Sequence, residues 1–283
     1  MLANTWFLTG ASSGLGRALC ESLVEQGCRV AATARDPAML EPMAPAQPDA
    51  YWTGRLDVTD GDQIRSAVDA AFVAFGRVDV IVSNAGYGLF GAAEELTDEQ
   101  IDRQIQTNLL GPIRLARAVL PYLRAQGGGR IVQISSSAGQ VALPNMSLYH
   151  ASKWGVEGFF DSLAAEVAAF GIGVTIVEPG SVATDFAGRS LVMPPALDAY
   201  TGSPSAAMRR AIEDGTVRQP GDVRRMAEAI ISSIAREPAP RRLALGSDAY
   251  VVMRKALRDR LSALEAQQDL ARSTDGAPQT QVR

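Results

Sequence analysis

The sequence predicts an α/β fold: one doubly wound parallel sheet of about seven strands, with helices on both faces. Three observations predict it. Short runs rich in β-branched residues alternate with longer helical patterns, and no repeat or linker interrupts the alternation before about residue 185. The runs Val80-Ile81-Val82 and Ile131-Val132 are apolar throughout, as in strands that are buried on both sides. Strands that alternate with helices form right-handed crossovers, which make the sheet parallel.

The expected strands are the β-branched runs, in chain order Trp6 to Thr9, Arg29 to Thr33, Tyr51 to Leu56, Val78 to Val82, Arg130 to Ser135, Val174 to Glu178 and, more weakly, Arg241 to Leu245. Helical segments are expected to start near Gly14, Asp60, Thr97, Leu148 and Gly221. Asp60 and Thr97 suit helix N-caps, because each precedes acidic residues and an apolar-periodic run.

We expect a single domain over residues 1–271. Between residues 186 and about 217, prolines and glycines break regular structure while apolar residues persist. A lid over an apolar ligand and an excursion packed on the body of the domain explain this segment equally well. Residues 272–283 lack core residues, and a disordered tail is expected there.

Composition excludes several classes of protein. Of the 283 residues, 47% are hydrophobic and 20% charged, which is ordinary for a globular chain. The net charge is -4 without a basic stripe, so no nucleic-acid partner is expected. Two cysteines and one histidine cannot build a disulfide framework or a zinc site, and no metal is predicted. With neither a basic leader nor an apolar run of transmembrane length, the expected location is cytoplasmic, with no membrane span.

A glycine-rich turn follows the first strand and opens a helix. Glycines at such a turn let the backbone approach a pyrophosphate, whose charge then lies against the helix N-terminus. The spacing is G-x-x-x-G-x-G instead of the commoner G-x-G-x-x-G. Its position after the first strand favours dinucleotide binding over a plain turn. The residues expected to form this cradle are Gly10, Ser12, Ser13, Gly14, Leu15 and Gly16.

The loop after the second strand bears on the choice of dinucleotide. A carboxylate there binds the ribose of NAD, whereas an arginine neutralises the extra phosphate of NADP. Arg35 favours NADP(H) over NAD(H). Asp36 leaves two interpretations open: it contacts the ribose, or it caps a helix that begins with Pro37.

The third and fourth strands end in residues that suit the adenosine part of a dinucleotide. Asp57, followed by Val58, is placed to accept a hydrogen bond from the adenine amino group, or else only turns the chain toward Asp60. Asn84-Ala85-Gly86 are small residues at the carboxyl edge of the sheet, where they leave room for a ligand.

Tyr149 and Lys153 are the candidate chemical pair. They are four residues apart at the start of a helix, so they share one face. A cation beside a phenol favours the phenolate, and we expect Lys153 to lower the pKa of Tyr149 toward neutrality. That pKa suits proton exchange with an alcohol or carbonyl oxygen. After the fifth strand, Ser136 is placed to bond that oxygen, although its serine neighbours at 135 and 137 leave the position open by one residue.

Together these residues resemble the short-chain dehydrogenase/reductase family over roughly residues 5 to 185, and more loosely beyond. Each match alone is unspecific, but the ordered set is highly specific. It comprises the glycine motif from Thr9 to Gly16, Asp57, Asn84-Ala85-Gly86, Asn108, Ser136, Tyr149 with Lys153, and Pro179-Gly180 with Thr184. The resemblance implies a Rossmann-type fold and a reaction without a metal, in which hydride moves between a nicotinamide and a carbonyl carbon.

The resemblance also assigns roles. Tyr149 is the general acid/base, and Lys153 lowers its pKa and binds the nicotinamide ribose. Ser136 polarises the substrate oxygen, because the family's serine stands thirteen residues before its tyrosine. Asn108 holds a water that links Lys153 to solvent. The nicotinamide carboxamide is flanked by Pro179, Gly180, Val182 and Thr184.

The same resemblance implies a homodimer or homotetramer formed through the long helices around residues 97–125 and 148–171. The segment from Arg241 to Tyr250 is similar to a branch that contains hydroxysteroid- and retinol-type dehydrogenases. With the apolar lid, Val141, Leu143 and Met146 near the site suggest a small to medium lipophilic alcohol or ketone as the substrate.

Two other functions are compatible with parts of this pattern. A serine hydrolase would have to use the only histidine, His150, but that residue adjoins Tyr149 and no G-x-S-x-G elbow accompanies it. We expect His150 on the helix surface or in a subunit interface. A non-catalytic NADP(H)-binding or redox-sensing protein on the same fold is the alternative, since fold does not determine function.

Overall fold

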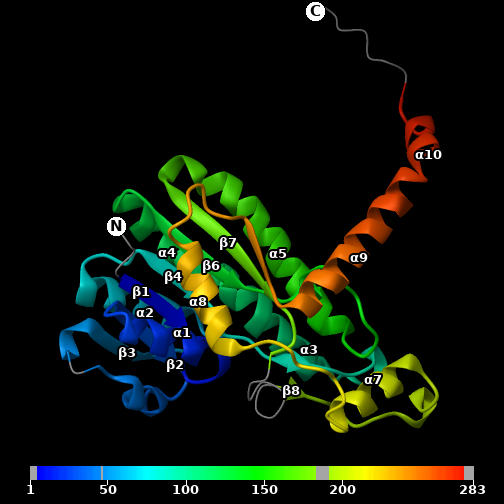
Figure 1. The fold of residues 1–283 in the computed structure, drawn as a ribbon, viewed down its shortest axis with the longest axis horizontal. Coiled ribbons are helices and arrows are strands. Elements are labelled where there is room, and N and C mark those ends of the chain that lie inside the picture. Colours follow the sequence, from blue (N-terminus) through cyan, green and yellow to red (C-terminus); the bar gives the residue numbers. More distant parts are fainter. Residues whose placement is uncertain (1–4, 46, 183–190, 277–283) are drawn as a thin grey trace, which may run out of the picture.

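The computed structural model describes residues 5–45, 47–182 and 191–276, and places a seven-stranded sheet between two layers of helices (Figure 1). All neighbouring strands are parallel, in the order β3-β2-β1-β4-β6-β7-β9. Their bounds are β1 Thr5–Thr9, β2 Arg29–Ala34, β3 Tyr51–Arg55, β4 Val80–Ser83, β6 Gly129–Ile134, β7 Ile172–Pro179 and β9 Arg242–Leu245. The predicted fold class and its seven strands are confirmed.

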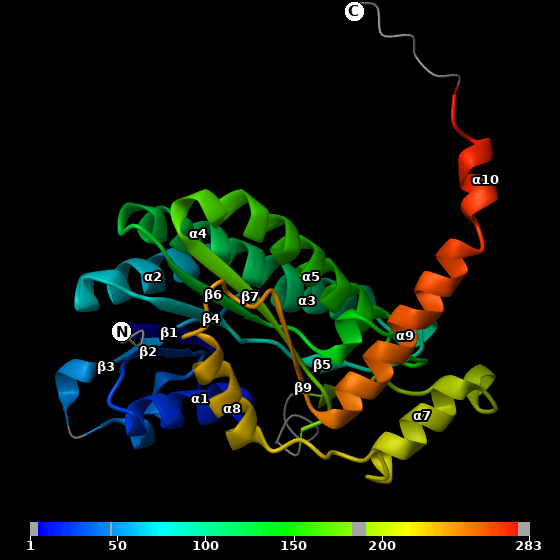
Figure 2. The same ribbon diagram turned by 45° about the horizontal axis from the view of Figure 1, so that its top comes forward.

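Apolar faces of the helices explain the two layers. Helices α2, α4 and α5 pack through residues such as Ile64, Leu115 and Phe160 on one face of the sheet, and helices α1 and α8 pack through Leu19 and Ile230 on the other. Figure 2 shows α4 and α5 on one side of the strands and α1 and α8 on the opposite side. The helix bounds are α1 Gly14–Glu25, α2 Gly61–Phe75, α3 Asp98–Ile105, α4 Gly111–Ala125, α5 Ser147–Val167 and α8 Val223–Ser233.

The predicted caps of α2 and α3 are present. Asp60 accepts hydrogen bonds from the backbone N–H groups of residues 62 and 63, and Thr97 accepts one from Gln100. Between α3 and α4 the helix continues through a π turn, Gln106–Leu110, which contains Asn108. Such turns widen a helix locally and often lie at functional sites.

Strand order locates the site. The chain runs outward from β1 to β2 and β3, then returns to place β4 on the other side of β1. In open parallel sheets of this kind, a ligand binds outside the carboxyl ends of the strands, at the point where the order reverses. The ends of β1 and β4 therefore define the expected binding crevice.

Several elements were not predicted. A two-residue pair joins β5 Gly88–Leu89 to β8 Leu191–Val192, and α7 Pro204–Glu213 lies inside the segment expected to form a lid. At the end of the chain, α9 Ser247–Glu265 and α10 Gln268–Ser273 extend away from the body (Figures 1 and 2). The tail expected over 272–283 falls mostly on residues 277–283, which lie outside the described residues.

None of the helices in the described ranges is both long enough and apolar enough to cross a membrane.

Candidate active site

A single cavity of ≈ 930 Å³ runs along the carboxyl edge of the sheet and collects most of the predicted site residues. Thr184 lies outside the described residues, and of the described ones Gly16 and Asn108 are not in the cavity wall. The predicted residues that line it are Gly10, Ser12, Ser13, Gly14, Leu15, Arg35, Asp57, Val58, Asn84, Ala85, Gly86, Ser136, Tyr149, Lys153, Pro179, Gly180 and Val182.

The glycine turn after β1 is shaped by close backbone contacts. Gly10 and Gly14 have φ angles of +66° and +55°, a region that favours glycine. A Cβ atom on Gly16 would collide with the Gly10 carbonyl oxygen and the Asn84 side chain. Asn84 Nδ2 donates to the carbonyl oxygens of Thr9 and Gly10 over 3.0 and 3.1 Å. Gly16 therefore acts behind the cavity wall, by letting α1 pack against the turn.

The start of α1 fits an anionic group. Ser13 is the N-cap residue, but its side chain makes no capping hydrogen bond, and the first turn holds no acidic residue. The N-terminal N–H groups and the positive end of the helix dipole are thus not offset by a side chain of this turn. With Ser12, Ser13 and Gly14 in the cavity wall, this geometry suits the pyrophosphate of a dinucleotide.

The loop after β2 shows Asp36 acting as a helix cap, one of the two interpretations open for it. Its carboxylate accepts a hydrogen bond from Ala38 N at 3.2 Å and caps a short helical segment that starts at Pro37. Arg35 is exposed and lines the cavity. The cap is present, and the arginine is the residue of this pair that reaches the ligand site.

Asp57 has one of the two roles predicted for it, since it turns the chain. Its Oδ1 atom accepts hydrogen bonds from the backbone N–H and the hydroxyl of Thr59, at 2.9 and 2.8 Å, which turns the chain toward α2. The residue also lines the cavity next to Val58. Its contact with adenine stays a prediction.

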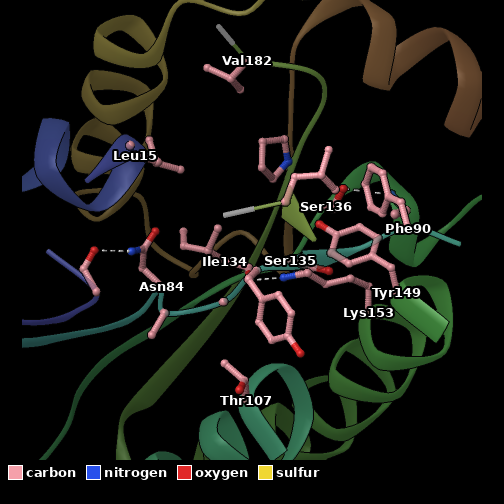
Figure 3. Close-up of a pocket in the computed structure, with 18 of the residues that line it drawn as sticks. Leu15, Asn84, Phe90, Thr107, Ile134, Ser135, Ser136, Tyr149, Lys153 and Val182 are labelled. Atoms are coloured by element: carbon pink, nitrogen blue, oxygen red, sulfur yellow. Dashed lines mark hydrogen bonds between the residues drawn. The ribbon is translucent and has the colours of Figure 1, made fainter. Parts of the chain in front are cut away.

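Tyr149, Ser136 and Lys153 lie together at the other end of the cavity, beside Phe90 (Figure 3). The phenol of Tyr149 lies beside the Ser136 side chain, which lowers its pKa, and its ring meets the Phe90 ring edge-on at 5.4 Å. Lys153 Nζ is 5.8 Å from the centre of the Tyr149 ring and donates to the carbonyl oxygen of Ile134. The neighbouring hydroxyl of Ser135 bonds elsewhere, to Glu157, so Ser136 is the serine that meets the tyrosine.

The pKa of Tyr149 departs from the prediction. In the chain by itself, burial raises it to about 12, and the contact with Ser136 only partly opposes this. Burial also lowers the pKa of Lys153 to about 8. The expected lowering of the tyrosine pKa is therefore wrong for the protein chain alone. Removing the phenol from water penalises its charged form more than the contact with Ser136 compensates.

Asn108 lies behind the cavity wall. Its side chain accepts a hydrogen bond from Tyr87 N at 3.0 Å and donates to Tyr87 O at 2.8 Å and to the Ser152 hydroxyl at 3.5 Å. It therefore joins the π turn to the chain after β4 and to α5. Its role in holding a water near Lys153 stays a prediction.

The sequence suggested that His150 lies on the helix surface or in a subunit interface, but in the structure it is buried within the chain. Its Nε2 atom accepts a hydrogen bond from Leu143 N at 2.9 Å, and its Nδ1 atom lies 2.8 Å from Ala138 O. Burial lowers its pKa, which favours the neutral ring that this pair of contacts requires. The residue was misplaced because the loop over residues 138–146 covers a helix face that the sequence pattern left exposed.

The substrate end of the cavity is apolar. Val141, Leu143 and Met146 line it as predicted. Leu191, Val192, Met208, Ile212 and Val217, which also line it, belong to the segment considered as a lid. Phe90, which follows β5, was not predicted.

Helix α7 packs on the body of the domain and also lines the cavity. Arg209 forms a buried ion pair with Glu95 at 2.6 Å and donates to Pro194 O at 2.8 Å, which packs the helix on the body. Met208, on the same helix, lines the cavity. Residues 186–190 of the predicted lid lie outside the described residues.

Asp248 was missed as a site residue. Its Oδ2 atom accepts a hydrogen bond from Ser181 N at 2.7 Å, and a Cβ atom on Gly180 would collide with its carboxylate. It thus supports the turn that was expected to flank the nicotinamide. No spacing pattern in the sequence indicates this contact, which depends on the pairing of β9 with β7.

Comparisons with known proteins agree with this geometry. Residues 4–192 match the family model of the short chain dehydrogenases. The oxidoreductase BOA17 of Botryotinia fuckeliana is 36% identical over 256 residues, which cover 90% of this chain and 93% of that protein. A short-chain dehydrogenase from Streptomyces avermitilis has 38% identity and a TM-score of 0.89, over 96% of this chain and 100% of that one. A variant of actinorhodin polyketide ketoreductase, solved with NADPH, has 30% identity and a TM-score of 0.71, over 86% and 95% of the two chains.

Proposed function

The chain belongs to the short-chain dehydrogenase family of oxidoreductases, and from this premise we propose that it interconverts an alcohol and a carbonyl with NADP(H), using Tyr149 as the acid–base residue. One observation carries the proposal. A single cavity holds the glycine turn at one end and the neighbouring side chains of Tyr149 and Ser136 at the other. A dinucleotide on the turn would thus extend toward that pair.

Each reactive side chain has one task in the proposed reduction. A bound nicotinamide supplies the hydride. Tyr149 gives its hydroxyl proton to the substrate oxygen as the alcohol forms. Ser136 donates a hydrogen bond to the same oxygen and orients it. Lys153 stabilises the resulting phenolate with its ammonium charge, and Asn108 holds the water through which the proton is restored. Oxidation runs the same transfers in reverse.

Lys153 is expected to act on Tyr149 most strongly when the cavity is filled. In the chain alone, its ammonium donates to Ile134 O, and burial keeps the pKa of the phenol high. A ligand that excludes water from the cavity strengthens the attraction between ammonium and phenolate. The lowered tyrosine pKa is therefore proposed as a property of the complex with the oxidised dinucleotide.

The proposed substrate is lipophilic. Beyond Tyr149, the cavity wall is formed by apolar side chains such as Phe90, Val141, Met208 and Ile212. Burying apolar substrate surface there is favourable by about 25 cal/mol per Å². The likeness to hydroxysteroid- and retinol-type dehydrogenases is compatible with this class and stays a prediction, as do a homodimer or homotetramer and a cytoplasmic location.

NADP(H) is proposed over NAD(H) because of Arg35. A guanidinium at the end of β2 recognises a 2′-phosphate by paired hydrogen bonds, and Asp36 beside it is engaged as a cap. The NADPH bound to the actinorhodin ketoreductase supports the same choice.

The substitution Arg35→Ala should weaken NADPH binding by about tenfold to hundredfold, which corresponds to the loss of a charged hydrogen-bonded contact. NADH binding should change by less than about twofold, because NADH carries no phosphate at that position. Titration of both cofactors by fluorescence measures this. Equal losses for NADPH and NADH would show that Arg35 does not read the phosphate.

The function itself is tested by following NADPH absorbance with a panel of ketones and aldehydes graded by apolar size. We expect turnover that depends on the carbonyl, with KM falling as apolar size increases. Tight NADPH binding without turnover on the whole panel would instead support the non-catalytic binding protein.

A further inference from the structure

A buried carboxylate that the proposed chemistry does not use lies directly behind the reactive residues. Glu157 is on α5, one turn after Lys153, and only 2% of its side chain is exposed. Its Oε1 atom accepts a hydrogen bond from the Ser135 hydroxyl at 2.6 Å. Its Oε2 atom accepts hydrogen bonds from Gln140 Nε2 at 2.5 Å and Arg242 Nη1 at 2.6 Å. A buried charge with this many partners is held in one position.

Two of these partners bracket the turn that carries Ser136. Ser135 precedes it and Gln140 ends the turn, so one carboxylate holds both sides. The turn also rests directly on Glu157, because a Cβ atom on Gly139 would collide with the carboxylate oxygen. Since α5 also carries Tyr149, Glu157 connects the serine that meets the substrate oxygen to the helix of the acid–base residue.

The charges around Glu157 come from every element packed against it. Arg242 of β9 contacts Glu157, Glu178 of β7 and Asp161 of α5. Arg260 of α9 reaches the cluster through Gln140, to whose Oε1 atom it donates at 3.2 Å. Burial together with Glu157 raises the pKa of Glu178 to about 7, so the net charge of the cluster changes near neutral pH. The charge of Glu157 also raises the pKa of Lys153, against the larger effect of burial.

We propose that Glu157 is a positioning residue for the reaction: its carboxylate fixes Ser136 against Tyr149 through Ser135 and Gln140, and its charge stabilises the ammonium of Lys153. This inference rests on the proposed function. It assigns Arg242 the task of holding this carboxylate in place inside the protein, which the pairing of β9 with β7 makes possible.

The test compares Glu157→Gln with Asp161→Asn in the full-length protein with NADPH and a carbonyl substrate. Both changes remove one negative charge from α5 and from the surroundings of Arg242, but Asp161 is one turn farther from Lys153. We expect Glu157→Gln to lower kcat on the order of tenfold to hundredfold, because small displacements of reacting groups have effects of this size. NADPH affinity should stay within about twofold.

The pH profile separates positioning from simple loss of structure. Without the Glu157 charge, the pKa of Lys153 falls further, so the alkaline decline of kcat should move to lower pH. Asp161→Asn should leave kcat and the alkaline decline within about twofold of the wild type, since its charge is more distant and partly exposed.

A third variant, Ser135→Ala, keeps the carboxylate but removes one of its bonds to the turn. Its kcat should fall without a shift of the alkaline decline, and this prediction holds even if Glu157→Gln does not fold. A folded Glu157→Gln with wild-type kcat and pH profile would overturn the inference, as would an unchanged kcat in Ser135→Ala. A wild type that binds NADPH but turns over no carbonyl would overturn the proposed function. An active wild type with unaffected variants would overturn only the role of Glu157, so the two failures are distinguishable.

Discussion

Tyr149→Phe is expected to lower kcat for carbonyl reduction by about three orders of magnitude, within the range for loss of a general acid. Only the hydroxyl is removed. The ring keeps its buried position and its edge contact with Phe90, so the fold and the cavity should persist. NADPH affinity should therefore change by less than about twofold, since the loss concerns the transition state alone. Steady-state NADPH absorbance and a fluorescence titration measure the two quantities.

Tyr87→Phe is the matched control for this experiment. Tyr87 lines the same cavity, and its contacts with Asn108 are made by its backbone. Its kcat should stay within about threefold of the wild type, because the substitution leaves every proton-transferring group in place. A Tyr149→Phe variant that keeps more than about a tenth of the activity would assign the proton transfer to another group.

Lys153→Met is expected to have a comparably large effect, with kcat/KM reduced by about three orders of magnitude. Methionine approximates the length of the lysine stem but removes the ammonium, and with it both the stabilisation of the phenolate and the proposed contact with the nicotinamide ribose. Unlike Tyr149→Phe, this variant should also bind NADPH more weakly. Cofactor titration thus separates the two variants.

The ionisation of Lys153 predicts how activity and the free energy of unfolding change with pH. Burial lowers its pKa to about 8 in the folded chain, below its ordinary value of 10.5. The ammonium is present below about pH 8 and is lost above it, so wild-type activity should decline on that side. In the window between the two pKa values the unfolded chain binds more protons than the folded one, so the free energy of unfolding rises with pH there.

It follows that the buried ammonium destabilises the fold at neutral pH. Lys153→Met should therefore have a higher Tm than the wild type, although it is far less active. Differential scanning calorimetry at pH 7 checks this. A lower Tm together with the lost activity would mean that the lysine is mainly structural.

Local patterns in the sequence were sufficient to predict the sheet and the main site residues. The central strands are short β-branched runs buried on both faces, and the bounds of all seven strands were predicted within two residues. The glycine turn and the pair Tyr149–Lys153 were predicted because each depends on a fixed spacing in the chain. The turn needs glycines at set positions, and two residues four apart share one face of a helix. These features depend on residues close together in the chain.

The features that were missed depend on tertiary pairing or on depth of burial. Ile176 of β7 pairs with Arg242 of β9, and this register brings Arg242 to Glu157, 85 residues away in the chain. Asp248 reaches the turn after β7 for the same reason. No spacing rule indicates such contacts.

The sequence also could not show in which direction the pKa of Tyr149 shifts from its ordinary value. The spacing of Tyr149 and Lys153 showed that a cation would be near, but it did not show how far the phenol is removed from water. In the structure both side chains are buried, and desolvation is the larger effect on each.

The ionisation of Tyr149 itself tests the central claim most directly. Tyrosinate absorbance can be titrated with pH in the wild type and in Tyr149→Phe, with and without NADP⁺, so that the difference isolates this one phenol. Without cofactor, the pKa should be about 12. With NADP⁺ bound, it should move toward neutrality in the wild type and stay high in Lys153→Met. A phenol that keeps its high pKa in the wild-type complex would contradict the proposed role of Tyr149 as the group that exchanges the proton.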